Sequence, residues 1–529
     1  MSKEKFSSEI IQAYQFAGPS IIIGAAMFET EVLHEHFIRI PLKTLNGHGL
    51  IAGATGTGKT KTLQIISEQL SAQGVASLLL DIKGDLSGIA AMGTNNAKIE
   101  ERHAKIGLPF AADGSPVEFL SLSNDKGIRL RATVTEFGPV LFSKIMDLND
   151  IQTGVITLVF KWCDDNQLPL IDLNDVKKVL QYLSNEGKEQ IEQEYGNIST
   201  TTVGTIMRKI IELEQQGAEL FFGEPSFDVE DLVRKDEDGK GIISILRVTD
   251  IQDKPKLFST FMLQILAEIY ATFPEAGDLD RPKLCLFIDE AHLVFNEASK
   301  ALLDQIESII KLIRSKGIGI FFITQNPADV PDGVLSQLGL KVQHALRAFT
   351  AKDRKAIKLA AENFPISDYY NTDELLTSLG IGEAMATALN EKGIPTPLVH
   401  VYLRAPQSRM DVLTEDELNH LIRNSDIASK YSQAIDRESA YEILAGKLEE
   451  AQEETTQAEL RKQREDYEEP SRRTKEEKST FEKVITSSTT RQIGSTIARE
   501  LTRGLLGVLG VKTSTRRTTT RKKSPFSWF

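Results

Sequence analysis

The sequence contains few cysteines and no long apolar run, and these two shortages exclude several classes of protein. Among its 529 residues only Cys163 and Cys285 are cysteines, too few for a disulfide framework or a cysteine-ligated metal site. No stretch reaches the roughly 18 continuous apolar residues of a membrane-spanning helix. The first residues, MSKEKFSSEIIQ, lack the apolar core of a secretory signal. We therefore expect a cytoplasmic protein, with Cys285 buried inside an apolar run.

Positive charge is also in short supply. The chain has 62 Lys and Arg against 75 Asp and Glu, for a net charge of −13 at pH 7. This balance argues against a generally basic nucleic-acid-binding surface, although it permits a local basic channel. The hydrophobic fraction of 41% and the charged fraction of 26% are ordinary for a globular protein. The length allows about two to four domains.

What the sequence does contain is a series of apolar runs that are typical of buried parallel strands. These runs lie at 49–54, 76–82, 241–248, 283–290, 317–325 and 341–348. Helical patterns follow several of them, for example at 59–74 and 301–317. The repeated alternation of strand and helix predicts an α/β fold with a mainly parallel, doubly wound sheet. A further strand is expected in SIIIGAAMFE near the start, and the last strand of the core within 395–406.

The same patterns divide the chain into six parts. A lead-in at 1–45 precedes the first part of the core at 46–134, and a helical insertion at 135–235 separates it from the second part at 236–406. A charged helical or linker region follows at 407–480. Within 481–529, apolar residues at spacings of four predict an amphipathic helix at 488–510, followed by a basic, helical or disordered tail.

The stretch GATGTGKT matches the phosphate-loop pattern G-x-x-x-x-G-K-[ST] at every position. Glycines let backbone N–H groups wrap the phosphates without an obstructing Cβ, and the following helix adds a favourable dipole. We expect Lys59 to neutralise the β- and γ-phosphates of ATP and Thr60 to hold Mg²⁺. The predicted nucleotide-binding residues are Gly53, Ala54, Thr55, Gly56, Thr57, Gly58, Lys59 and Thr60.

A second motif, IDEAH, ends the apolar run at 283–290. Its Asp289 suits the Walker B acid that binds Mg²⁺, and Glu290 suits the base that polarises the attacking water. Asp81 ends another apolar run. It either faces the same crevice, at the carboxyl ends of the strands, or is an ordinary loop acid.

The letters DEAH are also those of a DEAH-box helicase. That class needs a second RecA-like domain, whereas the residues after Pro406 have helical or disordered patterns. The strand after Walker B ends in Gln325, where a polar side chain can contact the γ-phosphate and report its presence. Arg314, at the end of the preceding helix, is expected to reach the nucleotide of a neighbouring subunit as an arginine finger.

Five separated blocks of this sequence resemble the HerA/FtsK family of hexameric DNA-pumping ATPases. They are LIAGATGTGKT, DIKGDLSG, LFIDEAHLVF, LIRSKGIGIFFITQNPADVP and QHALRAFTAKD, and they look most like the bacterial HerA-like (YjgR-like) branch. The resemblance implies a RecA-like P-loop ATPase core that uses ATP and Mg²⁺, the residue roles given above, a homo-hexamer and DNA as the partner. It also makes Arg347 a second candidate for the finger, the alternative being a strand-edge arginine paired with a local acid.

The sequence departs from the archaeal members of that family in the segment ahead of the phosphate loop. They carry a β-barrel there that docks a nuclease, whereas Gly53 lies near the start of this sequence. We therefore do not expect a nuclease partner.

Three functions are compatible with these patterns. The first is a ring-forming ATPase that translocates on DNA or unwinds it, with pore loops expected around 83–102. The second is an ATPase of the same fold that moves or remodels protein, which the net charge of −13 favours. The third is a nucleotide-dependent switch or scaffold. The C-terminal helix is expected to dock on the core or, with the basic tail, to bind a membrane surface, DNA or a protein.

Overall fold

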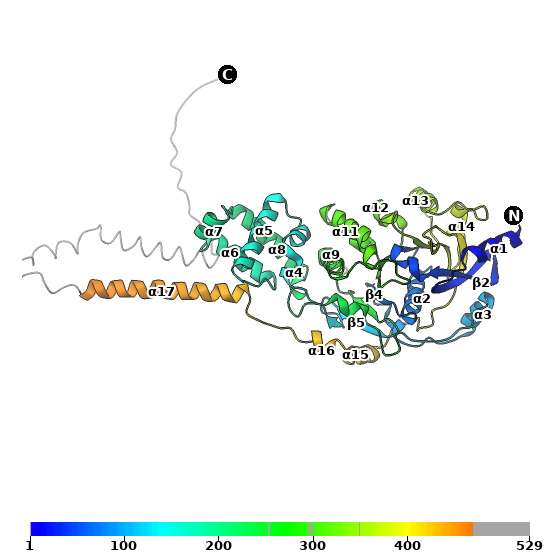
Figure 1. Cartoon of the computed structure of the whole chain (residues 1–529), viewed down its shortest axis with the longest axis horizontal. Coiled ribbons are helices and arrows are strands. Elements are labelled where there is room, and N and C mark those ends of the chain that lie inside the picture. Colours follow the sequence, from blue (N-terminus) through cyan, green and yellow to red (C-terminus); the bar gives the residue numbers. More distant parts are fainter. Residues whose placement is uncertain (1, 252–253, 296–299, 349, 469–529) are drawn as a thin grey trace, which may run out of the picture. The chain divides into compact units, whose positions relative to one another are not determined.

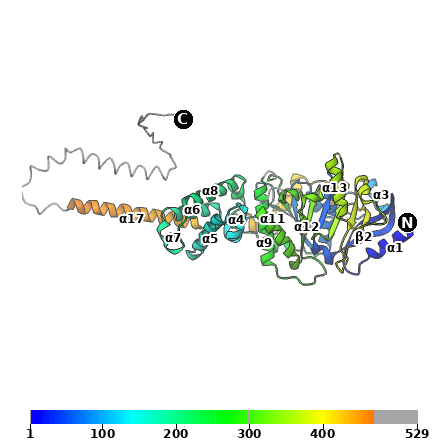
Figure 2. The same ribbon diagram turned by 90° about the horizontal axis from the view of Figure 1, so that it is seen from above.

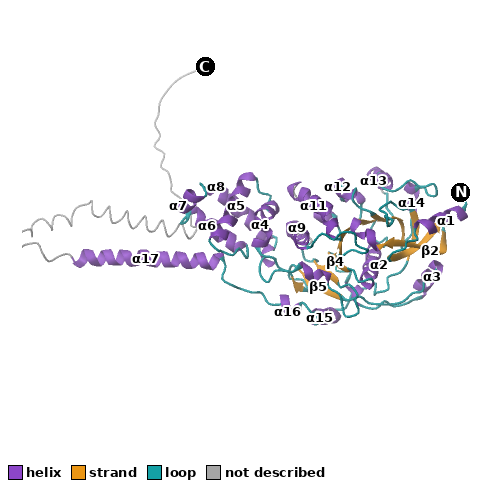
Figure 3. Ribbon diagram, viewed as in Figure 1, coloured by secondary structure: helices purple, strands orange, loops and turns teal. Residues whose placement is uncertain are grey.

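A twelve-stranded sheet forms the centre of the computed structural model, counted over the described residues, 2–251, 254–295, 300–348 and 350–468. It belongs to the larger of two structural units, Met1–Leu448, the smaller being Glu449–Phe529. The strands are labelled in Figure 1 and drawn in orange in Figure 3. Across the sheet their order is β2 (Glu31–Pro41), β1 (Ser20–Phe28), β12 (Val399–Leu403), β11 (Glu383–Thr387), β10 (Leu340–Gln343), β3 (Gly49–Ala52), β9 (Ile318–Thr324), β8 (Leu284–Ile288), β4 (Ala76–Asp81), β7 (Ile243–Arg247), β5 (Val117–Ser121) and β6 (Ile128–Arg129).

The strands from β10 to β6 in this order are all parallel to one another. At the other end, β11, β12, β1 and β2 pair in antiparallel fashion. The six apolar runs of the sequence form β3, β4, β7, β8, β9 and β10, and the predicted α/β fold with a mainly parallel sheet is confirmed. SIIIGAAMFE forms β1, and 395–406 contains β12.

Four strands of the sheet were not expected from the sequence: β2, β5, β6 and β11. In β5 the apolar run is interrupted by Glu118, which is buried and forms an ion pair of 3.0 Å with Arg234. β2 lies at the edge of the sheet, and its alternation of exposed and buried residues is irregular. Short or interrupted strands of this kind carry a weak apolar pattern, so only their pairing partners reveal them.

Apolar side chains cover both faces of the sheet, as the alternation of β8 illustrates. Leu284, Leu286 and Ile288 belong to one buried cluster, which also contains apolar residues of α9 (Pro255–Thr272) and α11 (Lys300–Ile313). Cys285 and Phe287 belong to a second cluster, on the face covered by α2 (Lys59–Ala72). Cys285 is fully buried, as the sequence predicts.

Five α-helices, followed by two short 3₁₀ helices, lie between β6 and β7, and the α-helices gather together in Figures 1 and 2. They are α4 (Val134–Ile145), α5 (Asp150–Asp165), α6 (Leu173–Ser184), α7 (Lys188–Glu194) and α8 (Thr200–Gln215). Three of them begin with a capping box, in which the side chain before the helix and the side chain three residues later satisfy each other's backbone N–H groups. These helices occupy the stretch where the sequence predicts an insertion.

After β12 the chain forms α15 (Glu415–Arg423), α16 (Ala428–Tyr431) and α17 (Ala440–Glu468). The remainder of the charged region up to 480, the amphipathic helix predicted at 488–510 and the basic tail lie outside the described residues. In the part of the chain that the structure describes, no helix combines the length and the apolar character needed to span a bilayer.

Candidate nucleotide-binding site

Four neighbouring strands end at one edge of the sheet, and each is followed there by a candidate residue. β3, β9, β8 and β4 are adjacent and parallel, so their carboxyl ends meet. The phosphate loop follows β3, Gln325 follows β9, and the pair Asp289 and Glu290 follows β8. Asp81 is the last residue of β4. The structure thus brings together three groups that are far apart in the sequence: the phosphate loop, the candidate sensor and the Walker B acids.

The phosphate loop is tied to the strands on both sides of β3. The N–H group of Gly53 donates to the carbonyl of Thr324 over 3.2 Å, and that of Ala54 donates to the carbonyl of Ala345 over 2.8 Å. Gly53 has a φ of 153°, and a Cβ at this position would lie 2.5 Å from the Cβ of His344. Only glycine fits there, because the loop passes directly over the side chain of His344.

Helix α2 begins at Lys59, directly after the loop, and presents free backbone donors to it. The residue before the helix is Gly58, which has a φ of 116° and offers no side chain to cap the first N–H groups. Uncapped N–H groups and the helix dipole favour an anion at this point. Thr55 and Gly56 are exposed at the tip of the loop, whereas Thr57 is buried below it.

The ammonium group of Lys59 is folded over the loop. It donates to the carbonyls of Gly53 at 2.7 Å and Ala54 at 3.2 Å. Burial lowers the pKa of Lys59, and the positive charge of Lys83 lowers it further. The hydroxyl of Thr60 lies 3.5 Å from the Oδ2 atom of Asp85, at the outer limit of a hydrogen bond. Lys59 therefore contacts the phosphate loop itself, and Thr60 lies beside Asp85 of the loop that follows β4.

The Walker B acids are almost completely buried at the end of β8. Burial, together with the charge of Glu290, raises the pKa of Asp289 to about 6, although Lys83 opposes the rise. A buried carboxylate of this kind is stabilised by a nearby cation, which fits a Mg²⁺ ligand. Glu290 has a positive φ of 48°, a conformation that residues other than glycine rarely adopt and that is common at functional sites.

Two further side chains flank the carboxylate of Glu290. The ammonium of Lys83 forms an ion pair with its Oε1 atom and lies 3.9 Å from Oδ2 of Asp289. On the other side, Nδ1 of His292 lies 3.2 Å from Oε2 of Glu290. The sequence led us to expect Lys83 at the start of a pore-loop stretch, whereas the structure places its ammonium beside the Walker B acids, two residues after β4.

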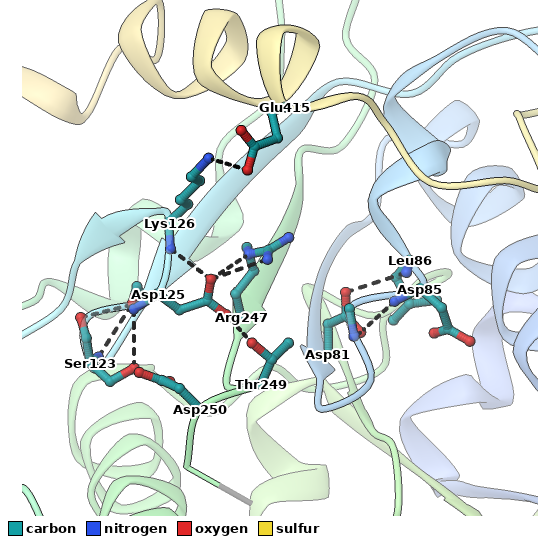
Figure 4. Close-up of polar contacts among 12 residues, drawn as sticks. Asp81, Asp85, Leu86, Ser123, Asp125, Lys126, Arg247, Thr249, Asp250 and Glu415 are labelled. Atoms are coloured by element: carbon teal, nitrogen blue, oxygen red, sulfur yellow. Dashed lines mark hydrogen bonds and ion pairs between the residues drawn. The ribbon is translucent and has the colours of Figure 1, made fainter.

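Asp81 closes the loop that carries Lys83. Its carboxylate accepts hydrogen bonds from the N–H groups of Gly84 at 2.7 Å, Asp85 at 3.2 Å and Leu86 at 3.3 Å, as Figure 4 shows in part. Burial and the charge of Asp85 raise the pKa of Asp81 to about 6. Of the two interpretations of Asp81, these contacts support the loop acid, and this loop is part of the site.

Gln325 lies between the phosphate loop and the Walker B acids. Its side chain is exposed, and it directly follows Ile323 and Thr324 of β9. The carbonyls of these two residues hold the phosphate loop and the segment after the Walker B acids in place. The carbonyl of Thr324 accepts from Gly53, and the carbonyl of Ile323 accepts from the N–H group of Ala291 over 2.9 Å. This position is suitable for a side chain that contacts a terminal phosphate.

Arg314 is at the opposite edge of the sheet from these residues. It follows α11 and precedes the first residue of β9, so it lies at the amino ends of the parallel strands. It lines an open pocket of about 660 Å³ together with Lys43, Lys311 and Lys392. Among the residues that the structure describes, its guanidinium has no hydrogen-bond or ion-pair partner. Arg314 is therefore not part of the nucleotide site of its own chain.

Arg347 is nearer to the phosphate loop than Arg314 is. It follows β10, two residues after Ala345, the residue whose carbonyl accepts from the loop. Its guanidinium donates to the carbonyl of Thr377 over 3.4 Å, which differs from the local acid suggested by the sequence. The two arginines are thus at opposite edges of the sheet.

The expected pore-loop stretch, 83–102, has a structural residue at its far end. Arg102 donates to the carbonyls of Gly382 at 3.1 Å and Leu403 at 2.8 Å, and its guanidinium lies 4.0 Å from the ring centre of Tyr402. These contacts fasten α3 (Ala97–Ile106) to the sheet. The guanidinium of Arg102 is therefore occupied by contacts within its own chain.

Comparisons with known proteins identify related sequences and folds. The sequence model of the family described as "Helicase HerA-like C-terminal" matches residues 28–514. Two curated relatives are DNA double-strand break repair helicases HerA, from Sulfurisphaera tokodaii (23% identical over 352 residues, 66% of this chain) and Saccharolobus solfataricus (23% over 366 residues, also 66%). The chain spans 63% of the length of each of these relatives.

Among solved structures, the bacterial conjugative coupling protein TrwBdeltaN70 has a similar fold. Its trigonal form in complex with sulphate has a TM-score of 0.51 and 13% identity, and covers 77% of this chain and 94% of its own. The unbound monoclinic form has a TM-score of 0.50 and 12% identity, with the same coverage. At this level of identity the likeness concerns the fold alone.

Proposed function

Because the chain belongs to the Helicase HerA-like C-terminal family, we propose that it is an ATP-hydrolysing ring motor that translocates on DNA or unwinds it. The observation that carries the proposal is the convergence of the phosphate loop, Gln325 and the Walker B acids at one edge of the sheet. The curated relatives named as DNA repair helicases support DNA as the polymer. Two free, buried cysteines support a reducing, cytoplasmic location.

The residues at this edge fit ATP and Mg²⁺. The uncapped start of α2 and the ammonium of Lys59 would hold the phosphates, while Thr60 and Asp289 would hold the metal. Bound Mg²⁺ would neutralise charge on the phosphate oxygens.

The remaining side chains would carry out hydrolysis. Glu290 would accept a proton from the attacking water, and its carboxylate would have to lie beside the terminal phosphate to do so. Gln325, exposed between the loop and Glu290, would contact the terminal phosphate and respond to its loss. Both act within one chain, because β9 lies between β3 and β8.

The position of Arg314 supports a ring. An arginine at the amino ends of the strands can contact a nucleotide only if that nucleotide is bound to another subunit. Two different surfaces would then meet, which is a head-to-tail interface. Contacts of this type close into a ring when the rotation between subunits is suitable, and we propose a homo-hexamer. An arginine finger supplied in this way contributes roughly 10³ to 10⁵ in rate.

A second candidate function is the movement or remodelling of protein by the same ATPase fold. The net charge of −13 favours it, because an acidic surface repels a nucleic-acid backbone. A nucleotide-dependent switch or scaffold would use the same site with slow turnover.

The first experiment is steady-state ATP hydrolysis by the purified chain, with and without double-stranded DNA. We expect DNA to stimulate turnover and Glu290→Gln to lower it by about 100-fold or more while ATP still binds. Stimulation by an unfolded protein but not by DNA would support the second candidate. Slow turnover that no polymer changes would support the switch. Unchanged turnover in Glu290→Gln would remove its assigned role.

The trans role of Arg314 is tested by mixing two inactive variants. Arg314→Ala should bind ATP without hydrolysing it, as should Glu290→Gln. In mixed rings, a subunit with an intact Glu290 can stand beside a neighbour with an intact Arg314, so hydrolysis should return at a fraction of the interfaces. A mixture that stays inactive contradicts the trans assignment. Recovery with Arg347→Ala in place of Arg314→Ala would assign the finger to Arg347.

A further inference from the structure

The loop between β4 and the short 3₁₀ helix at Ser87–Ala90 connects two parts of the nucleotide site. Its sequence is DIKGDL, at 81–86. Lys83 of this loop forms an ion pair with the carboxylate of Glu290, and Asp85 accepts a long hydrogen bond from the hydroxyl of Thr60. The loop therefore extends from the expected Mg²⁺-binding threonine to the expected catalytic glutamate.

We propose that Lys83 is a second phosphate-binding lysine, whose ammonium contacts the terminal phosphate of a nucleoside triphosphate and positions Glu290 beside it. The inference rests on the proposed function and extends it, since it assigns to Lys83 the distinction between a triphosphate and a diphosphate. Lys83 is a positioning residue for Glu290 and a ligand-binding residue for the phosphate.

The hydrogen-bonding capacity of Lys83 supports this role. An ammonium group has three N–H donors. Among the described residues Glu290 is its close ion-pair partner, and Oδ2 of Asp289, at 3.9 Å, is beyond hydrogen-bond distance. The side chain is 41% exposed, so its remaining donors are accessible from the site. Phosphate oxygens are the acceptors that suit such a group.

The charges around Lys83 lead to the same conclusion. Lys83 and Lys59 are close enough for the charge of Lys83 to lower the pKa of Lys59. An anion near both groups offsets their repulsion, and the carboxylates of Glu290 and Asp289 already supply negative charge beside Lys83. A polyphosphate is such an anion, and Lys59 approaches it from the phosphate loop while Lys83 approaches it from the Walker B side.

The loop is held firmly enough to place the ammonium. On its inner side, Asp81 accepts three backbone N–H groups of the loop, and its own carbonyl accepts from the N–H group of Val248 over 3.2 Å. On its outer side, a Cβ at Gly84 would lie 3.3 Å from Thr249, so the loop packs against that residue.

Thr249 is fixed in turn by an ionic cluster that is drawn beside the loop in Figure 4. Its hydroxyl donates to Asp125. The same carboxylate accepts from Arg247 over 3.2 and 3.1 Å. The ends of β5 and β7 thus support the segment that carries Lys83, which favours a defined position for its side chain over a mobile one.

The test compares the binding of two nucleotides to the full-length chain and its variants. Dissociation constants for a non-hydrolysable ATP analogue and for ADP, both with Mg²⁺, are measured by competition with a fluorescent nucleotide. Lys83→Met, which keeps the aliphatic stem and removes the charge, should weaken the ATP analogue by about tenfold or more. ADP binding should change by less than about twofold, because ADP has no terminal phosphate for Lys83 to contact.

Two further variants separate charge from structure. Lys83→Arg keeps a cation and should retain the preference for the triphosphate to within about threefold. Lys161→Met removes an exposed lysine of α5, in the helical insertion, and should leave both dissociation constants unchanged. Melting curves of the variants check that each is folded, and Lys83→Gln replaces Lys83→Met if the latter is not.

The outcomes distinguish this inference from the function on which it rests. Equal weakening of both nucleotides by Lys83→Met would indicate a structural role only, and no change in either would remove Lys83 from the site. Either result overturns the inference while nucleotide binding by the unmodified chain stands. Failure of the unmodified chain to bind either nucleotide would overturn the proposed function, and this inference with it.

Discussion

His48 should make the stability of the protein sensitive to acid, because its two ring nitrogens are used in a way that only the neutral form allows. Nε2 is 2.9 Å from the carbonyl of Ile310 and donates to it, and Nδ1 accepts from the N–H group of Ile320 over 3.1 Å. The side chain is 2% exposed. Burial, with a contribution from the charge of Arg314, lowers the pKa of His48 to about 4. A proton on Nδ1 would also break the bond from Ile320.

The direction and size of the effect follow from linkage. In the unfolded chain His48 takes up a proton as the pH falls below about 6.5, whereas in the folded chain it does so only near 4. Its contribution to stability is therefore complete above pH 6.5 and is lost as the pH falls from 6.5 to 4. The loss is about 2 kcal/mol at pH 5 and about 3 kcal/mol below pH 4.

The variant His48→Asn isolates this contribution. Asparagine does not titrate, and at this position (φ 59°, ψ 171°) it meets the same backbone strain as histidine does. It removes the bond to Ile310, so the variant should be less stable than the unmodified chain at pH 8. Urea titrations followed by circular dichroism at pH 8 and pH 5 should show this difference shrinking by about 2 kcal/mol. A difference that stays constant to within about 0.5 kcal/mol would refute the linkage argument.

Three other substitutions test contacts described above. Gly53→Ala should abolish binding of an ATP analogue without unfolding the chain, because the new Cβ would lie 2.5 Å from that of His344; normal affinity would contradict the close approach. Arg102→Met should lower the free energy of unfolding by about 2 kcal/mol through the lost carbonyl contacts and the lost stacking on Tyr402, with nucleotide affinity unchanged. Asp81→Asn should reduce the rate of ATP hydrolysis by loosening the loop, and an unaltered rate would show that its three N–H contacts are dispensable.

The phosphate loop and the Walker B pair were located from the sequence because each is a continuous motif at the end of a strongly apolar run. GATGTGKT follows the run that forms β3, and Asp289 and Glu290 follow the run that forms β8. The carboxyl ends of parallel strands lie at one edge, so their approximate proximity was predictable as well. The sensor role of Gln325 was predicted by the same reasoning, from the end of β9.

Lys83 and Asp85 could not be assigned in this way. Both lie in a short loop whose course depends on the three backbone contacts of Asp81 and on the packing of Gly84 against Thr249. A lysine after a strand is usually a solvated side chain, and its ion pair with Glu290 depends on residues about two hundred positions apart. Only the folded chain brings such a pair together.

The sequence by itself determined the class of the fold and predicted the chemistry of the candidate nucleotide site, because both depend on local patterns: apolar runs, glycines and the residues that end each strand. The tertiary structure decided the order of the strands, with β9 between β3 and β8 and with β2, β5, β6 and β11 added to the sheet. It also put Lys83 on Glu290, and Arg314 at the edge opposite the phosphate loop. These arrangements depend on packing between segments that are distant in the chain. The sequence of one segment alone does not reveal which distant segment it packs against.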